Sequence, residues 1–149
     1  MVNIKKEVQK LIRKHKSRNP FIIAKNMGIT VKYLDLSPKC PKGMFKKILR
    51  RKFIIINMTR VNNDAELNTI MAHELGHAIL HSSSSAFFLH DHTYYARGKF
   101  EREANLFAAE LLIDTLNIDT KSMQNYSLFQ LASTLNVPME LLKYKFNIL

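Results

Sequence analysis

The feature that most constrains this chain is a histidine pair inside an apolar helical segment. From about Ala65 to His81 the apolar residues recur at helical spacing: Leu67, Ile70, Met71, Leu75, Ala78 and Ile79. His73 and His77 lie four positions apart within this segment, so both project from one face of a helix, one turn apart. We therefore expect a largely buried helix that presents two imidazoles to a common point.

The segment His73-Glu74-Leu75-Gly76-His77 has H-E-x-x-H spacing. Two imidazoles one turn apart can occupy two corners of a tetrahedral zinc site. Glu74 lies about 100° round the helix from His73, so it can flank the metal and accept a proton from a water that the metal acidifies. We expect Gly76 to leave room for a substrate backbone. The alternative is a helix whose two histidines are ordinary surface or core residues.

A catalytic zinc site needs a third protein ligand and an open fourth position. The residues of suitable type are His81, His90, His92, Glu101 and Glu103. Three residues along one straight helix do not converge easily on one ion, so we expect His81 to be a helix-end residue favoured by the helix dipole.

A second helix, predicted from Lys99 to about Ile113, offers the carboxylate candidates. One face of it carries Glu101, Ala104, Asn105 and Ala108. The small alanines would let this face pack closely against the histidine helix, and Glu101 could then complete the zinc site. Asn105 could accept a hydrogen bond from the free N–H of His73 or His77. Glu103 points away from this face and is expected to be exposed to solvent.

The remaining pattern predicts an α+β fold: a helix-rich single domain with a small three-stranded sheet packed on the histidine helix. The expected order is N-terminal helices in 1–28, the sheet in 29–57, the metal-bearing helices in 64–113 and a pair of short helices in 127–149. Two of the strands are expected to form a hairpin that turns near Arg50-Arg51. A chain of 149 residues is long enough to bury one core without disulfides.

Composition restricts the setting of the protein. Cys40 is the single cysteine, so no intramolecular disulfide can form, which suits a reducing cytoplasm. No apolar run approaches the roughly 20 residues of a membrane span, and the first residues lack a signal-peptide pattern. The net charge of +11 is compatible with weak nucleic-acid binding, with attraction to an acidic protein, or with a solvated surface alone.

Two motifs together resemble those of the ImmA/IrrE family of metallopeptidases. The first is Met71-Ala72-His73-Glu74-Leu75-Gly76-His77-Ala78-Ile79-Leu80-His81. The second is Glu101-x-x-Ala104-Asn105-x-Phe107-Ala108-Ala109-x-Leu111-Leu112. The segment from Asn19-Pro20 to Gly28-Ile29 is also similar, so the resemblance covers roughly residues 19 to 149. The chain departs from the family pattern after Leu112, where Ile113-Asp114 replaces the frequent Met-Pro.

The resemblance implies a gluzincin-like site with zinc on His73, His77 and Glu101 and with Glu74 as general base. It also implies a bacterial, phage or mobile-element setting, in which related proteins cleave helix-turn-helix repressors and relieve transcriptional repression. An oxyanion stabiliser should accompany such a site. The candidates between the two metal-bearing helices are His90, His92, Tyr94 and Tyr95.

Two other functions compete with a peptidase. One is a regulatory protein- or DNA-binding module on a peptidase-like scaffold, because the segment from Leu128 to Leu142 resembles half of a helix-turn-helix unit. The same segment could instead be a packing module. The other is a structural zinc site, which usually has four protein ligands, often cysteines, whereas Cys40 stands alone.

Overall fold

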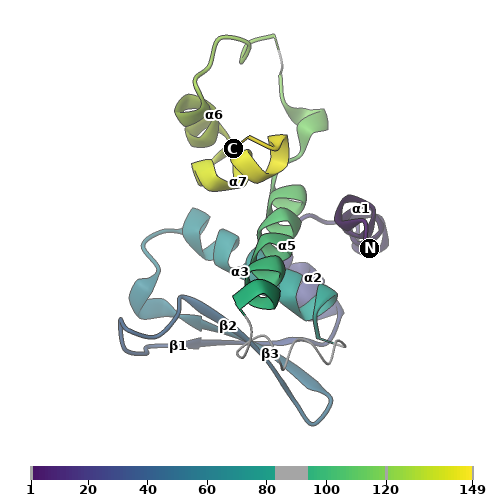
Figure 1. Cartoon of the computed structure of the whole chain (residues 1–149), viewed down its shortest axis with the longest axis vertical. Helices are drawn as coiled ribbons and strands as arrows, with labels where there is room; N and C mark the ends of the chain where they lie inside the picture. Colours follow the sequence, from purple (N-terminus) through teal and green to yellow (C-terminus); the bar gives the residue numbers. More distant parts are fainter. Residues whose placement is uncertain (1, 83–93, 120, 149) are drawn as a thin grey trace.

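A computed structural model describes residues 2–82, 94–119 and 121–148, and no side chain is described for residues 94–97 (Figure 1). The chain forms an α+β fold, which confirms the expected fold class. Its elements are α1 (Ile4–His15), α2 (Pro20–Asn26), β1 (Thr30–Leu34), β2 (Gly43–Ile48), β3 (Arg51–Asn57), η1 (Met58–Arg60), α3 (Asp64–Leu80), α5 (Tyr94–Leu112), η3 (Thr115–Asn117), α6 (Leu128–Leu135) and α7 (Met139–Phe146). In Figure 1 the sheet lies at the bottom and α6 and α7 at the top, with α3 and α5 between them.

The sheet has the strand order β1-β3-β2, with β3 in the centre. β1 runs parallel to β3, and β2 pairs antiparallel with β3 so that Phe45 faces Ile54. The hairpin turns at Leu49 and Arg50, whose φ angles are 49° and 71°. The turn therefore lies one residue earlier than expected, and Arg51 already belongs to β3. Positive φ at both central residues is what a two-residue hairpin with a type I′ turn requires.

The histidine helix α3 packs on the sheet through the same face of β3 that carries Ile54 and Ile56, both fully buried. Lys52 lies on this face as well, and its Nζ donates to the carbonyl oxygen of Ala78 at 3.1 Å. Asn63 caps the start of α3 by accepting a hydrogen bond from the backbone N–H of Glu66. The sheet and the cap together fix the position of α3, and with it the direction in which its side chains point.

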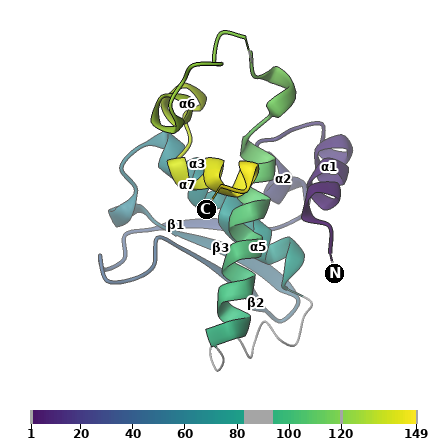
Figure 2. The same cartoon turned by 45° about the horizontal axis from the view of Figure 1, so that its top comes forward.

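The helix α5 crosses α3 closely and is the long vertical helix at the front of Figure 2. Gly76 makes this approach possible, because a Cβ there would lie 3.1 Å from Cβ of Phe107 and 3.2 Å from Cα of Ala104. The expectation that Gly76 leaves room for a substrate is therefore wrong. Its missing side chain faces the neighbouring helix, where the small Ala104 provides the complementary surface.

The C-terminal helices pack onto α5. Leu141 and Leu142 of α7 are buried in the same hydrophobic core as α3 and α5. Lys145 of α7 forms a 2.6 Å ion pair with Glu110 of α5, and both side chains are largely buried. These contacts give α7 a packing role in this fold. Among the described residues, no helix combines the length and the apolar character needed to cross a membrane.

Candidate metal centre

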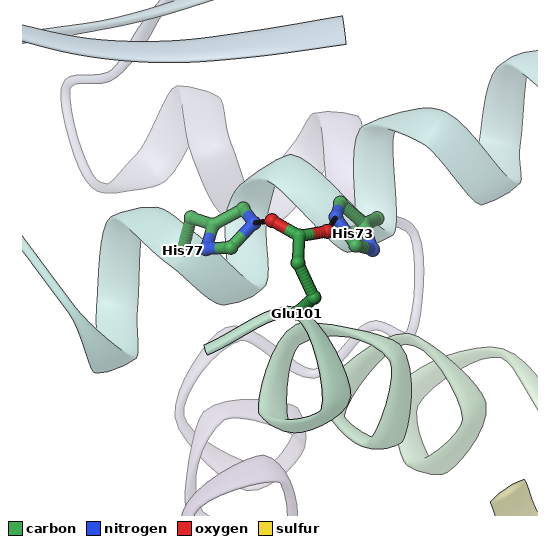
Figure 3. Close-up of side chains that lie close together, drawn as sticks. All are labelled: His73, His77 and Glu101. Carbon is green, nitrogen blue, oxygen red and sulfur yellow. Dashed lines mark ion pairs between the residues drawn. The ribbon is translucent and has the colours of Figure 1, made fainter. Parts of the chain in front are cut away.

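Three side chains converge between α3 and α5. Nε2 of His73 lies 3.1 Å from Oε2 of Glu101, and Nε2 of His77 lies 3.1 Å from Oε1 of the same carboxylate. Figure 3 shows the Glu101 carboxylate reaching from α5 into the space between the two rings of α3. The rings themselves are 4.8 Å apart and nearly perpendicular. The structure thus brings together the three residues expected as zinc ligands.

This group has a spacing close to that of ligand atoms around a shared metal ion. Its potential ligand atoms all lie within 4.8 Å of one another, while a tetrahedral zinc ion holds its ligand atoms roughly 3.3–3.6 Å apart. Two imidazoles and one carboxylate also form a donor set that zinc accepts. The residues present therefore fit a divalent metal.

The electrostatic environment of the ligand group favours a positive charge. Hydrogen bonds from His73 and His77 hold the pKa of Glu101 far below its usual value of 4.5, so its carboxylate is ionised. Burial of the His73 ring works against protonation. The hydrogen bond that His73 donates to Glu101 and the charge of Glu74 outweigh this effect and raise the pKa of His73. The acidic groups around His73 thus favour a positive charge at this point of the site.

Asn105 contacts the ring nitrogen of His73 that does not face Glu101. Its Oδ1 lies 2.8 Å from Nδ1 of His73. Its Nδ2 donates to Oη of Tyr144 on α7 at 3.4 Å. The sequence spacing leaves open whether Asn105 contacts His73 or His77. In the structure it contacts His73. Because Nδ1 contacts Asn105, Nε2 is the nitrogen that faces Glu101.

His77 is held by a residue that the sequence did not assign to the site. Its Nδ1 lies 3.0 Å from Nδ1 of His81, and Nε2 of His81 lies 2.8 Å from Oε2 of Glu103. His81 does end α3, but burial lowers its pKa against the opposing effect of Glu103. The expected helix-end position of His81 is confirmed, and its lowered pKa disfavours the charged form that the helix dipole would stabilise. Glu103 is expected to be exposed to solvent, and the structure shows it only partly exposed, at 29%, because it contacts His81.

Glu74 occupies a buried position beside the ligand group, with 7% of its surface exposed. Burial raises the pKa of its carboxyl above the usual 4.5, while the charges of His73 and His77 act in the opposite direction. Gly43 of β2 lies directly against it, because a Cβ there would be 2.9 Å from Oε1 of Glu74. Sequence reasoning missed Gly43, since only the folded hairpin brings it to α3.

An open groove runs along this site. One wall is the edge strand β2 with the residues before it, from Pro41 to Lys47. The opposite wall consists of Glu66, Thr69, Ile70, His73, Glu74, His77, Glu101, Asn105 and Pro138. The ligand group and Glu74 therefore face a space that is lined on the other side by residues of β2 and the segment before it.

The remaining candidates take no place in the ligand group. Within the described residues, the group contains neither His81 nor Glu103. His90 and His92 lie outside the described residues, as do the side chains of Tyr94 and Tyr95. The expected oxyanion stabiliser therefore stays a prediction.

Sequence comparisons identify the class of protein that has this fold and site. Residues 24–147 match the peptidase M78 family, described as the IrrE N-terminal-like domain. The match covers most of the chain, so this protein belongs to that metallopeptidase family, as the two motifs indicated. A metallopeptidase acts with a metal ion, and the group of His73, His77 and Glu101 is suited to hold one.

Two relatives extend this assignment over nearly the whole chain. The uncharacterized immunity region protein 2 of Bacillus phage phi105 is 36% identical over 142 residues, which cover 95% of this chain and 88% of the relative. The metallopeptidase ImmA of Bacillus subtilis (strain 168) is 31% identical over 144 residues, covering 95% of this chain and 83% of the relative.

Proposed function

We propose that this protein is a zinc-dependent endopeptidase that cleaves a helix-turn-helix transcriptional repressor and so relieves repression. The observation that carries the proposal is the convergence of His73, His77 and Glu101 beside the buried Glu74, at the wall of an open groove. The two imidazoles and the carboxylate would hold the ion. Zinc, when bound, would polarise the scissile carbonyl and acidify a water molecule.

Glu74 would act as the general base. A carboxylate that accepts a proton during peptide hydrolysis works best when its pKa is raised towards the working pH. Burial raises the pKa of Glu74, and the contact with Gly43 limits where its carboxylate can move. Both features support a proton acceptor held in a fixed position.

Asn105 would orient one ligand. The Nδ1–H of His73 would donate to Oδ1 of Asn105, which leaves the Nε2 lone pair directed towards the ion. Partners of this kind typically change metal affinity by about 10- to 100-fold when they are removed. The contact from Tyr144 to Asn105 extends this support to α7.

The groove suits a substrate in extended conformation. β2 is an outer strand of the described sheet, with β3 on one side and the groove on the other. A peptide segment that adds to this edge would gain backbone hydrogen bonds without depending on its sequence. It would lie along Gly43 to Lys47, opposite His73, Glu74 and His77. An internal segment can enter because the groove is open, which supports endopeptidase rather than terminal cleavage.

A repressor substrate is supported by the family and by its setting. One relative is an immunity region protein of a phage, and another is the metallopeptidase ImmA. Immunity in this sense depends on repression of phage genes, so a repressor is the natural protein substrate. Repressors act in the bacterial cytoplasm, where the proposal places the reaction.

The test uses the purified protein with zinc and a helix-turn-helix repressor from the same genome as the candidate substrate. Glu74→Gln should retain one zinc ion per chain and lose cleavage of the repressor. Glu140→Gln is the matched control, because Glu140 is an exposed glutamate on α7, and it should cleave at the wild-type rate. Cleavage by Glu74→Gln at the wild-type rate would exclude the proposed base. Absence of cleavage by the wild-type protein would exclude this substrate.

A further inference from the structure

A hydrogen-bonded series leads away from His77 through two further side chains. Nδ1 of His77 contacts Nδ1 of His81 at 3.0 Å, and Nε2 of His81 contacts Oε2 of Glu103 at 2.8 Å. His81 is only 2% exposed, and its ring also packs on Phe100 with 4.3 Å between ring centroids. Both nitrogens of a buried imidazole are therefore in hydrogen-bond contact with groups of defined chemistry.

The positions of the protons follow from the geometry around His77. Its Nε2 faces Glu101 in the ligand group, so a neutral ring that ligates a metal through Nε2 must carry its proton on Nδ1. Among the described residues, Nδ1 of His77 lies 3.0 Å from Nδ1 of His81, so that N–H donates to Nδ1 of His81, which must then be unprotonated. His81 consequently carries its own proton on Nε2 and donates it to the Glu103 carboxylate. All hydrogen bonds in the series run in one direction.

Glu103 determines which tautomer His81 adopts. With the other tautomer, two N–H groups would face each other across the 3.0 Å contact between His77 and His81. An ionised carboxylate is an acceptor only, so Glu103 at 2.8 Å favours the tautomer with the proton on Nε2 of His81. His77 is thereby provided with an acceptor on the side away from the ligand group.

We infer that His81 and Glu103 are a positioning pair that orients His77 for metal binding, with a histidine inserted between the ligand and the carboxylate. The inference rests on the proposed metal site and extends it to two residues with no ligand role. His81 is the acceptor for His77, and Glu103 fixes the tautomer of His81. Neither residue contacts the substrate groove: both are outside the set of residues that line it.

The first experiment measures zinc affinity by competition with a chromophoric chelator. His81→Leu retains bulk but offers no acceptor, and it should bind zinc about 10- to 100-fold more weakly than the wild type. His81→Gln offers an amide oxygen to His77 and should recover part of that loss. Glu103→Ala should also weaken zinc binding, whereas Arg102→Gln, at an exposed neighbouring position, should not. If His81 served only to fill space, both variants would change zinc affinity only as far as they destabilise the fold. His81→Gln would then not recover the affinity that His81→Leu loses.

The second experiment needs no variant. In the zinc-loaded wild-type protein, 15N NMR should find the proton of His77 on Nδ1 and that of His81 on Nε2. A scalar coupling across the hydrogen bond should connect the two Nδ1 nitrogens. Unchanged zinc affinity of His81→Leu, or a proton on Nδ1 of His81, would overturn the pairing and leave the proposed function intact. If the wild-type protein bound no zinc, both the pairing and the proposed function would fail.

Discussion

Gly43 and Glu74 are in direct contact: a Cβ atom at Gly43 would lie 2.8 Å from Cγ and 2.9 Å from Oε1 of Glu74. The same atom would be 2.7 Å from Cγ2 of Ile70. An alanine therefore cannot be accommodated unless Glu74 or Ile70 moves. We predict that Gly43→Ala displaces the Glu74 carboxylate and lowers the cleavage rate by about 10- to 100-fold. Zinc stoichiometry should remain unchanged, because the ligand group is not touched.

Gly98 provides the control for this substitution. Among the described residues, no atom outside its own helix and neighbours lies within 4 Å of a Cβ at this position. Gly98→Ala should leave cleavage unchanged and stabilise α5 by about 0.5–1 kcal/mol. If Gly43→Ala cleaves as fast as Gly98→Ala, the contact with Glu74 does not limit the position of its carboxylate.

Gly76 should be sensitive for a different reason. Its missing Cβ faces Ala104 and Phe107 across the α3–α5 contact at 3.1–3.2 Å, so alanine would push two helices apart. We expect Gly76→Ala to destabilise the protein by about 1–2 kcal/mol, because overpacking outweighs the gain in helix propensity. Urea unfolding measures this difference. A stability equal to or above that of the wild type would show that the helices accept the extra methyl group.

The metal-free site should make a pH-dependent contribution to stability. The pKa of Glu101 is lowered, so its contribution is present above the usual value of 4.5 and is lost as the pH falls through the lowered pKa. The pKa of His73 is raised, so its contribution is present below the usual value of 6.5 and is lost as the pH rises through the raised pKa. The ion pair therefore stabilises the metal-free protein most between these two usual values.

Unfolding in the presence of a chelator tests this window by comparing the wild type with Glu101→Gln. The difference in stability should be largest in weakly acidic solution and should shrink above neutral pH. Zinc binding should show the opposite trend with rising pH, because the metal must displace the proton of His73. A stability difference that grows steadily from acid to alkaline pH would contradict the assigned pKa directions.

Lys145 and Glu110 should stabilise the fold as a pair. Their charged atoms are 2.6 Å apart, and their side chains are 9% and 12% exposed. Lys145→Met would leave the carboxylate of Glu110 largely buried without its partner and should cost about 3–5 kcal/mol. The double variant Lys145→Met/Glu110→Leu should be more stable than the sum of the single losses predicts. Strict additivity of the two losses would exclude this coupling.

Several parts of the fold and site follow from local sequence pattern. The spacing of His73 and His77 places both on one helix face, and the alanines near Glu101 indicate which face of α5 meets α3. The three strands and the α+β class also follow from apolar periodicity and turn residues, and the structure confirms them. These features depend on short-range spacing, which a sequence displays directly.

The support of His77 depends instead on how two helices are rotated against each other. Glu103 lies two positions after Glu101 and so projects in a different direction from α5. It is three positions after Phe100, and the His81 ring contacts both Phe100 and Glu103. Spacing within α5 alone cannot show that the C-terminal end of α3 reaches the face of α5 that carries Phe100 and Glu103. Likewise, Leu49-Arg50 lacks the Asn-Gly type of turn signal, so the sequence pattern does not fix the turn to the residue.

Anomalous diffraction at the zinc absorption edge, from crystals of the zinc-loaded protein, tests the central claim most directly. The account predicts one strong peak per chain, about 2 Å from Nε2 of His73, Nε2 of His77 and a carboxylate oxygen of Glu101. A zinc peak bound elsewhere, or a peak at the histidines with Glu101 turned away from it, would contradict the account.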